Sequence, residues 1–118
     1  MRPGAGFRLS AGADADVDRI LDETLRRFGT KQIQTYAALI ESAFQLVADE
    51  PARPGSRDQG DLMPELRSFP VALAAKRRGA SAHVVFYVPD GTTGGGILIV
   101  RVLHQAMDPT GHLPDADG

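Results

Sequence analysis

The sequence predicts an α+β domain in which an antiparallel helical hairpin packs on a small, mainly antiparallel sheet. Two apolar stripes with helical period follow one another in the first half of the chain, and extended β-branched segments follow in the second half. One short apolar segment precedes the helices, so the expected order is strand, helix, helix, strand, strand, strand. One layer of helices on one sheet buries all of these apolar faces.

The first strand is expected at Phe7–Leu9, and Ser10 or Gly12 then caps the first helix. Gly29 ends this helix, because glycine accepts a left-handed backbone without a side-chain penalty. Acids in the first turns favour the helix start, since the partial positive charge at a helix N-terminus attracts carboxylates. These acids are Asp14, Asp16 and Asp18, and the apolar stripe is Val17, Ile20, Leu21, Leu25 and Phe28.

The second helix is expected to begin at a Thr30 cap and to end before Pro51. The link to the first helix is so short that the two helices must fold back on each other as a hairpin. The apolar stripe of the second helix is Ile33, Tyr36, Ala37, Ile40, Ala43, Phe44 and Val47.

Three strands are expected after a proline- and glycine-rich loop over residues 51–64. The first covers Leu66–Leu73, where Pro70 favours an edge position or a bulge. His83–Val88 is the next strand, and a glycine-rich turn leads to the last strand. That last strand, Ile97–Leu103, is apolar on both faces apart from one arginine, and we therefore expect it at the centre of the sheet.

Length and composition favour one domain. The chain has 118 residues and 42% hydrophobic content, and we expect a single domain over residues 1–113 with a disordered tail at 114–118. There is no cysteine, which excludes disulfides and thiolate chemistry. No apolar run is long enough to span a bilayer, and the N-terminal residues lack the apolar stretch of a signal peptide. A cytoplasmic protein without a membrane partner is therefore expected.

Charge is distributed unevenly, although the net charge is only −2. Residues 14–50 contain eight acids and four bases, a net of −4, whereas residues 53–104 contain seven bases and four acids, a net of +3. The second half is therefore expected to present a surface that can approach an acidic partner. Its densest basic cluster, Lys76, Arg77 and Arg78, is either a solvated turn or a contact patch.

Known site motifs are incomplete in this chain. The acids of the first helix lack the glycine and the bidentate glutamate of a calcium loop, and Gly91–Gly96 lacks the lysine and hydroxyl of a phosphate loop. His83, His104 and His112 have no metal-ligand spacing, and no serine has the sequence context of a nucleophile. We therefore expect no metal, no cofactor and no catalytic residue.

Polar side chains in and after the strands are the better candidates for contact. Arg67 and Arg101 each interrupt an apolar strand, so each guanidinium needs a carboxylate or phosphate partner or a position at the rim. That partner is either an acid within the chain, from the loop, or a group on another molecule. His104 and Met107 follow where the last strand leaves the sheet, so a rigid element carries them to one edge.

Read in order, these segments resemble the ParE branch of the RelE/ParE toxin superfamily. The most specific part is the ending over residues 101–108, RVLHQAMD, after PELRSFP at residues 64–70 and HVVFY at residues 83–87. The resemblance covers most of residues 7–113. The segment at residues 72–82 departs from it, because it is longer than the turn of many relatives.

The resemblance implies a bacterial toxin of a type II toxin–antitoxin module. ParE-like toxins bind DNA gyrase and trap its cleaved DNA complex, whereas RelE-like relatives on the same fold cleave messenger RNA at the ribosome. A co-transcribed ParD-like antitoxin holds such a toxin inactive, and operator DNA is bound by the antitoxin and not by the toxin itself. The expected partners are therefore a ParD-like antitoxin and DNA gyrase.

The residues favour a binding toxin over a ribonuclease. RNA cleavage needs a base, an acid and cations around the phosphate, and the last strand ends without the terminal tyrosine common in RNA-cleaving relatives. His104 is a candidate base, and Arg67 and Arg101 are candidate cations. Together they do not form a complete catalytic set for RNA cleavage. Arg67, Arg101, His104 and Met107 are expected instead to contact the target. An inactive toxin that only binds the antitoxin is the third hypothesis.

Antitoxin binding is expected at an apolar groove between the helical hairpin and the sheet, which can receive an amphipathic helix, or at an exposed sheet edge. Leu21, Leu25, Tyr36 and Ile40 belong either to this groove or to the internal core. Both assignments are compatible with their helical spacing.

Overall fold

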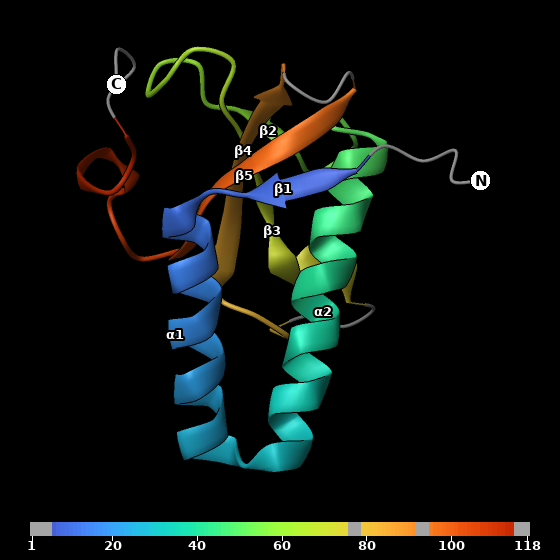
Figure 1. The fold of residues 1–118 in the computed structure, drawn as a ribbon, viewed down its shortest axis with the longest axis vertical. Helices are drawn as coiled ribbons and strands as arrows, with labels where there is room; N and C mark the ends of the chain where they lie inside the picture. The colour runs from blue at the N-terminus through green and yellow to red at the C-terminus, as the bar shows by residue number, and fades with distance from the viewer. Residues whose placement is uncertain (1–5, 76–78, 92–94, 115–118) are drawn as a thin grey trace.

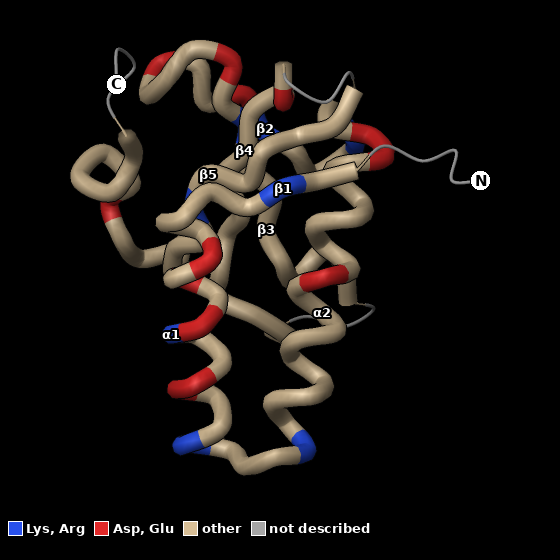
Figure 2. The backbone as a smooth tube through the Cα atoms, viewed as in Figure 1, with Lys and Arg blue, Asp and Glu red and all other residues tan. Residues whose placement is uncertain are grey.

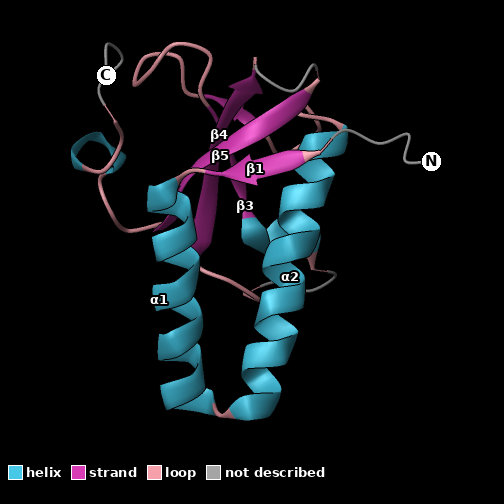
Figure 3. Cartoon of the chain, viewed as in Figure 1, coloured by secondary structure: helices cyan, strands magenta, loops and turns pink. Residues whose placement is uncertain are grey.

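The computed structural model describes residues 6–75, 79–91 and 95–114. Two antiparallel helices pack beside one face of a five-stranded sheet and extend beyond its end (Figures 1 and 3). This arrangement confirms the predicted α+β class and the order of the predicted elements. The elements are β1 (Phe7–Leu9), α1 (Ala11–Phe28), α2 (Thr30–Asp49), β2 (Arg57–Asp58), β3 (Arg67–Pro70), η1 (Val71–Ala74), β4 (His83–Asp90), β5 (Gly96–His104) and η2 (Pro109–Gly111).

The sheet has the strand order β1-β5-β4-β3-β2. β1 runs parallel to β5, and the β5–β4, β4–β3 and β3–β2 pairs are antiparallel. β5 therefore lies between two strands, as its apolar sequence predicted. The β4–β5 register shifts at Phe86 and Tyr87, which pair with Arg101 and Ile99, so Val100 is the extra residue of a bulge.

The helical hairpin is formed by a one-residue link. Ser10 caps α1 as predicted, since its Oγ accepts a hydrogen bond from the Ala13 N–H at 3.0 Å. Gly29 ends α1 with a φ of 90°, and its N–H donates to the Leu25 carbonyl. The prediction that Thr30 caps α2 is wrong, because Gly29 holds the capping position of both helices and Thr30 is already helical.

Two apolar clusters lie on the two faces of the sheet. The larger one joins the helices to the sheet, with the Phe7 and Phe44 rings edge to face at 5.3 Å between centroids. The smaller one is built from Leu66, Phe86, Val100 and Leu103. Leu113 packs on the smaller cluster, as expected for the last anchor of the chain.

The predicted strand over Leu66–Leu73 is too long. β3 ends at Pro70, and the next four residues form η1, because proline has no N–H with which to continue a ladder. The edge position expected for this strand holds at Pro70 but not for the whole strand, because β2 pairs outside β3 at Arg67 and Ser68 only. The two-residue β2 pairs outside β3, and it lies within the segment that was predicted as an irregular loop.

Candidate functional site

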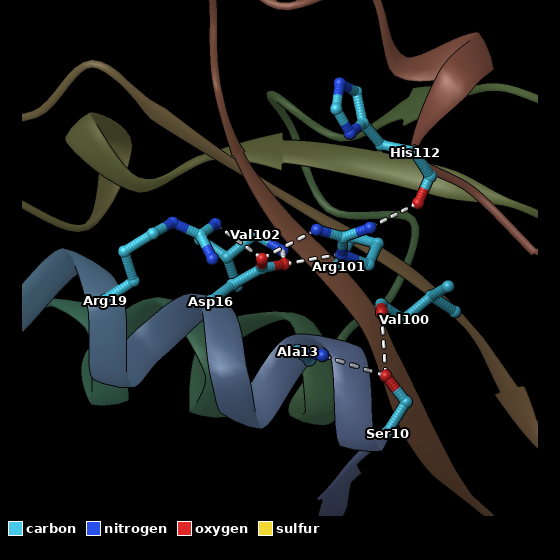
Figure 4. A network of polar contacts seen from close by, with 8 residues as sticks. All are labelled: Ser10, Ala13, Asp16, Arg19, Val100, Arg101, Val102 and His112. Carbon is cyan, nitrogen blue, oxygen red and sulfur yellow. Dashed lines mark hydrogen bonds and ion pairs between the residues drawn. The ribbon is translucent and has the colours of Figure 1, made fainter.

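Arg101, one of the two strand arginines expected to contact a target, forms hydrogen bonds inside the molecule (Figure 4). Arg101 donates from Nε and Nη2 to the two carboxylate oxygens of Asp16, each at 2.7 Å. Its Nη1 donates to the His112 carbonyl at 2.5 Å. Arg101 therefore ties α1, β5 and the C-terminal segment together. The partner is a helix residue and not an acid from the loop, which was the internal partner expected.

Asp16 is fully buried and receives two more hydrogen bonds. The Val102 N–H donates to Oδ2 at 2.9 Å, and Arg19 Nη2 donates to Oδ1 at 2.8 Å. Burial by itself raises the pKa of Asp16, but the bonds from Arg101, Val102 and Arg19 outweigh it, and the pKa lies below its ordinary value of 3.8. The carboxylate therefore stays charged in the folded protein.

This network replaces a strand at the edge of β5. β1 ends at Leu9, opposite Ile99, so the following part of β5 has no strand neighbour on that side. The first turns of α1 supply the partners: Ser10 Oγ donates to the Val100 carbonyl at 2.7 Å, and Asp16 accepts from Val102. A Cβ at Gly12 would lie 3.1 Å from Arg101 Cδ, so a small residue permits this close approach.

Arg67 also forms internal bonds. Its Nε donates to Ser56 Oγ at 2.7 Å, and among the described residues it forms no ion pair. The same hydroxyl contacts Tyr87 Oη at 2.6 Å, and Tyr87 donates to the Pro51 carbonyl at 2.6 Å. Arg67 therefore fastens the segment that follows α2 onto β3 and β4.

The predicted target contacts do not form one surface. Arg67 and Arg101 are turned into internal networks, whereas His104, the last residue of β5, and Met107, which follows the strand, are exposed. The predicted basic patch over residues 76–78 lies outside the described residues. Neither long helix of the described chain combines the length and apolarity needed to cross a membrane. The described part of the chain contains no group of three or more histidines and acids placed to hold a metal ion.

His104 and Met107 line a cleft of about 710 Å³, which we call the hairpin cleft. Its walls are one face of α1, the start of α2, residues 79–83 and the end of β5. Sequence reasoning did not find this cleft as a unit, because its walls come from four segments that are distant in the chain.

Hydroxyl and imidazole groups meet in the hairpin cleft. Tyr36 Oη contacts Ser81 Oγ and lies 2.7 Å from His83 Nδ1. His83 pairs with His104 across β4 and β5, with 5.7 Å between the ring centroids. Burial lowers the pKa of His83, and the nearby His104 lowers it further, so His83 is neutral near pH 7. Burial also raises the pKa of Tyr36, which keeps its proton.

The four residues predicted for the antitoxin groove or the core separate in the structure. Ile40 belongs to the core with 2% exposure, and Leu21 packs against that core. Tyr36 lines the hairpin cleft, and Leu25 is 41% exposed. Phe28 was expected in the buried stripe of α1, but it is 65% exposed because the last turn of α1 lies beyond the sheet (Figure 1).

The fold defines a two-layer α+β protein in which a helical hairpin covers one face of a mixed sheet. Residues 7–109 match the family model described as the ParE toxin of type II toxin-antitoxin systems, parDE. The chain therefore belongs to the ParE toxin family, which confirms the resemblance found in the sequence.

Relatives match nearly the whole chain. Toxin ParE1 of Caulobacter vibrioides is 36% identical over 91% of this chain and 96% of its own length. Toxin ParE of Escherichia coli is 32% identical over 92% of this chain and 93% of its own length. A solved chain of the chromosomal ParDE TA system from P. aeruginosa covers 85% of this chain and 95% of its own length, with a TM-score of 0.60 and 17% identity. That likeness supports the fold.

Proposed function

We propose that this chain is a toxin that binds and poisons DNA gyrase, and that a ParD-like antitoxin neutralises it. The observation that carries the proposal is the match of residues 7–109 to the ParE toxin model. Relatives named toxin ParE match over almost their full length, so the family assignment applies to the whole domain. The antitoxin partner is supported by the solved neighbour, which is described as a ParDE system.

The internal hydrogen bonds of Arg67 and Arg101 support a toxin that binds its target and does not cleave RNA. Cations that stabilise a cleaved phosphate must direct their N–H groups at the substrate. Three N–H groups of Arg101 are directed at Asp16 and His112, and Nε of Arg67 is directed at Ser56. These two guanidinium groups therefore serve the fold and are not directed at a substrate beside His104.

Gyrase assays test this proposal directly. Purified toxin is added to DNA gyrase and plasmid, and supercoiling and the yield of cleaved plasmid are measured. We expect supercoiling to fall and cleaved DNA to accumulate, and we expect the antitoxin to reverse both effects. Unchanged supercoiling and cleavage at a large excess of folded toxin would contradict the proposal.

A ribosome-dependent ribonuclease is the second candidate, and one observation favours it. His83 is held neutral beside His104 and the Tyr36 hydroxyl in an open cleft, and a neutral imidazole is a suitable general base. Toeprinting of a translated messenger RNA decides between the candidates. Toxin-dependent breaks that disappear in His83→Ala would support the ribonuclease, and absence of breaks would remove it.

The third hypothesis, an inactive toxin, makes a different prediction about growth. Induced expression of the chain without an antitoxin is expected to stop growth if the toxin is active. Normal growth with confirmed accumulation of folded protein would favour the inactive form.

A further inference from the structure

We infer that a small pocket beside Glu65 receives one lysine or arginine side chain of the target, DNA gyrase. The inference rests on the proposed function and adds to it a contact that recognises a cation. The pocket, which we call the Glu65 pocket, has a volume of about 240 Å³. Its lining is Pro51, Glu65, Arg67, Tyr87, Pro89 and Ile97, together with residues 90–91 and 95–96.

Glu65 occupies a backbone position that favours glycine. Its φ is 67°, and no other non-glycine residue of the described chain has a positive φ. The Leu66 N–H donates to the Met63 carbonyl at 3.1 Å, so residues 63–66 form a turn. With Pro64 second and a positive φ third, this turn has the features of type II, whose third residue is normally glycine or asparagine. A glutamate held in such a strained position points to a function for its side chain.

Glu65 is also the charged group of the pocket that has no ionic partner. It is exposed, and it forms no ion pair among the described residues. By contrast, Asp90 accepts a hydrogen bond from Arg8 Nε at 2.5 Å. Arg67 Nε donates to Ser56 Oγ at 2.7 Å. The Glu65 carboxylate is therefore available to a cation from another molecule.

The surroundings of the pocket favour a cationic occupant. α2 ends at Asp49, two residues before Pro51, and the C-terminal end of a helix carries a partial negative charge. Acidic positions lie at this helix end and at the end of β4 (Figure 2). Arg53, the base that follows Pro51 in the chain, is directed at the Leu46 carbonyl at 3.4 Å. A basic group of a partner would therefore meet complementary charge here.

The shape of the pocket suits a single long side chain. Pro51, Pro89 and Ile97 line it with apolar groups, and the Tyr87 hydroxyl is bonded to the Pro51 carbonyl. The volume of about 240 Å³ is below the roughly 300–1,000 Å³ of sites for small ligands. Lysine and arginine carry a charged head on an apolar stem. The stem can lie along the apolar walls while the head stays beside the exposed Glu65 carboxylate.

The Glu65 pocket and the hairpin cleft lie at opposite ends of β4 and β5. The pocket is lined by the end of β4 and the start of β5, whereas His83 at the start of β4 and His104 at the end of β5 line the cleft. The antitoxin groove is expected between the helical hairpin and the sheet. We therefore assign the Glu65 pocket to the target and not to the antitoxin.

Three variants of the full-length toxin test the inference. Glu65→Gln removes the charge and keeps the strained backbone, whereas Glu65→Gly removes both. Asp61→Asn is the control, because it makes the same acid-to-amide change at an exposed position of the same loop that does not line the pocket. The main measurement is the toxin concentration that halves supercoiling by DNA gyrase. Thermal unfolding and titration with the purified ParD-like antitoxin are measured for the same proteins.

We expect Glu65→Gln and Glu65→Gly each to raise the half-inhibiting concentration by about tenfold, as when one partner of an interfacial charge pair is lost. Asp61→Asn should stay within about twofold of the wild type. Glu65→Gly should also melt about 2–4 °C higher, because glycine relieves the left-handed strain. Antitoxin binding should be unchanged in all three variants. Lost inhibition combined with gained stability distinguishes a contact residue from a structural one.

Several results would overturn the inference. If the wild type and both Glu65 variants inhibit gyrase equally, the pocket does not contact the target, and the proposed function stands. If the folded wild type does not inhibit gyrase, the inference and the proposed target both fail. A lower melting temperature of Glu65→Gly would make Glu65 a structural residue. Weaker antitoxin binding with unchanged gyrase inhibition would assign the pocket to the antitoxin.

Discussion

The two ends of α1 use their side chains in opposite ways. Near the N-terminal end, Asp16 is fully buried and bonded to Arg101, Arg19 and Val102. Near the C-terminal end, Phe28 is exposed beside an open cleft. The first turns of α1 therefore stabilise the fold through buried hydrogen bonds, whereas its last turns expose their side chains.

Replacing Asp16 with Asn is expected to have the largest effect on stability. Breaking a buried ion pair leaves its partner without a counter-charge, and the loss should be about 3 kcal/mol, at the low end of the usual range because Arg101 keeps 21% side-chain exposure. Urea unfolding measures the change. Asp14→Asn, an exposed acid one half-turn earlier, is the control and should change stability little. Equal stability of both variants would contradict the structural role of Asp16.

Replacing Arg67 with Ala should have an intermediate effect. The variant loses a hydrogen bond from a charged donor to Ser56, which is worth about 1.5–3 kcal/mol. Arg57→Ala, at an exposed position on the neighbouring strand, is the control. Urea unfolding and gyrase inhibition are measured together. Unchanged stability combined with lost gyrase inhibition would instead make Arg67 a target contact.

Acid should weaken the fold through two groups in separate pH windows. The folded pKa of His83 lies below its ordinary value of 6.5, so the unfolded chain takes up this proton first and stability falls as the pH decreases below 6.5. The folded pKa of Asp16 lies below 3.8, so its contribution is complete above 3.8 and disappears as the pH falls through the folded value.

Melting temperatures across pH separate these two groups. His83→Gln should flatten the change just below pH 6.5, and Asp16→Asn should flatten the change below pH 3.8. An unaltered profile in His83→Gln would show that this imidazole does not stay neutral in the fold.

The smallest effect on stability is expected at the other end of α1. Phe28→Ala and Arg27→Glu remove exposed side chains, so the free energy of unfolding should change by no more than about 0.5 kcal/mol. Urea unfolding of the free toxin is the measurement. A loss as large as that of Asp16→Asn would remove the distinction between the two ends.

The sequence predicted the parts of the fold that depend on local signals. The Ser10 cap, the Gly29 stop and the central position of β5 follow from residue type and periodicity within a few positions. β2 has only two residues, too few to show a period, and it forms because the β3 backbone lies beside it. Short pairings of this kind depend on tertiary contact.

The candidate site was less predictable, because its partners are far apart in the chain. Asp16 was interpreted as one of three helix-start acids, although it lies four residues before Ile20 on the buried side of α1. That spacing was a usable signal for an inward carboxylate, but its partner, Arg101, is 85 residues away. The exposure of Phe28 depends on where the sheet ends, which the helical period does not encode.

Amide hydrogen exchange along α1, with and without the antitoxin, tests the division of this helix most directly. We expect residues 13–17 to be protected already in the free toxin, because the buried network fixes them. We expect residues 24–28 to exchange quickly in the free toxin and to gain protection in the complex. Gain of protection at residues 13–17, with no change at 24–28, would contradict the account.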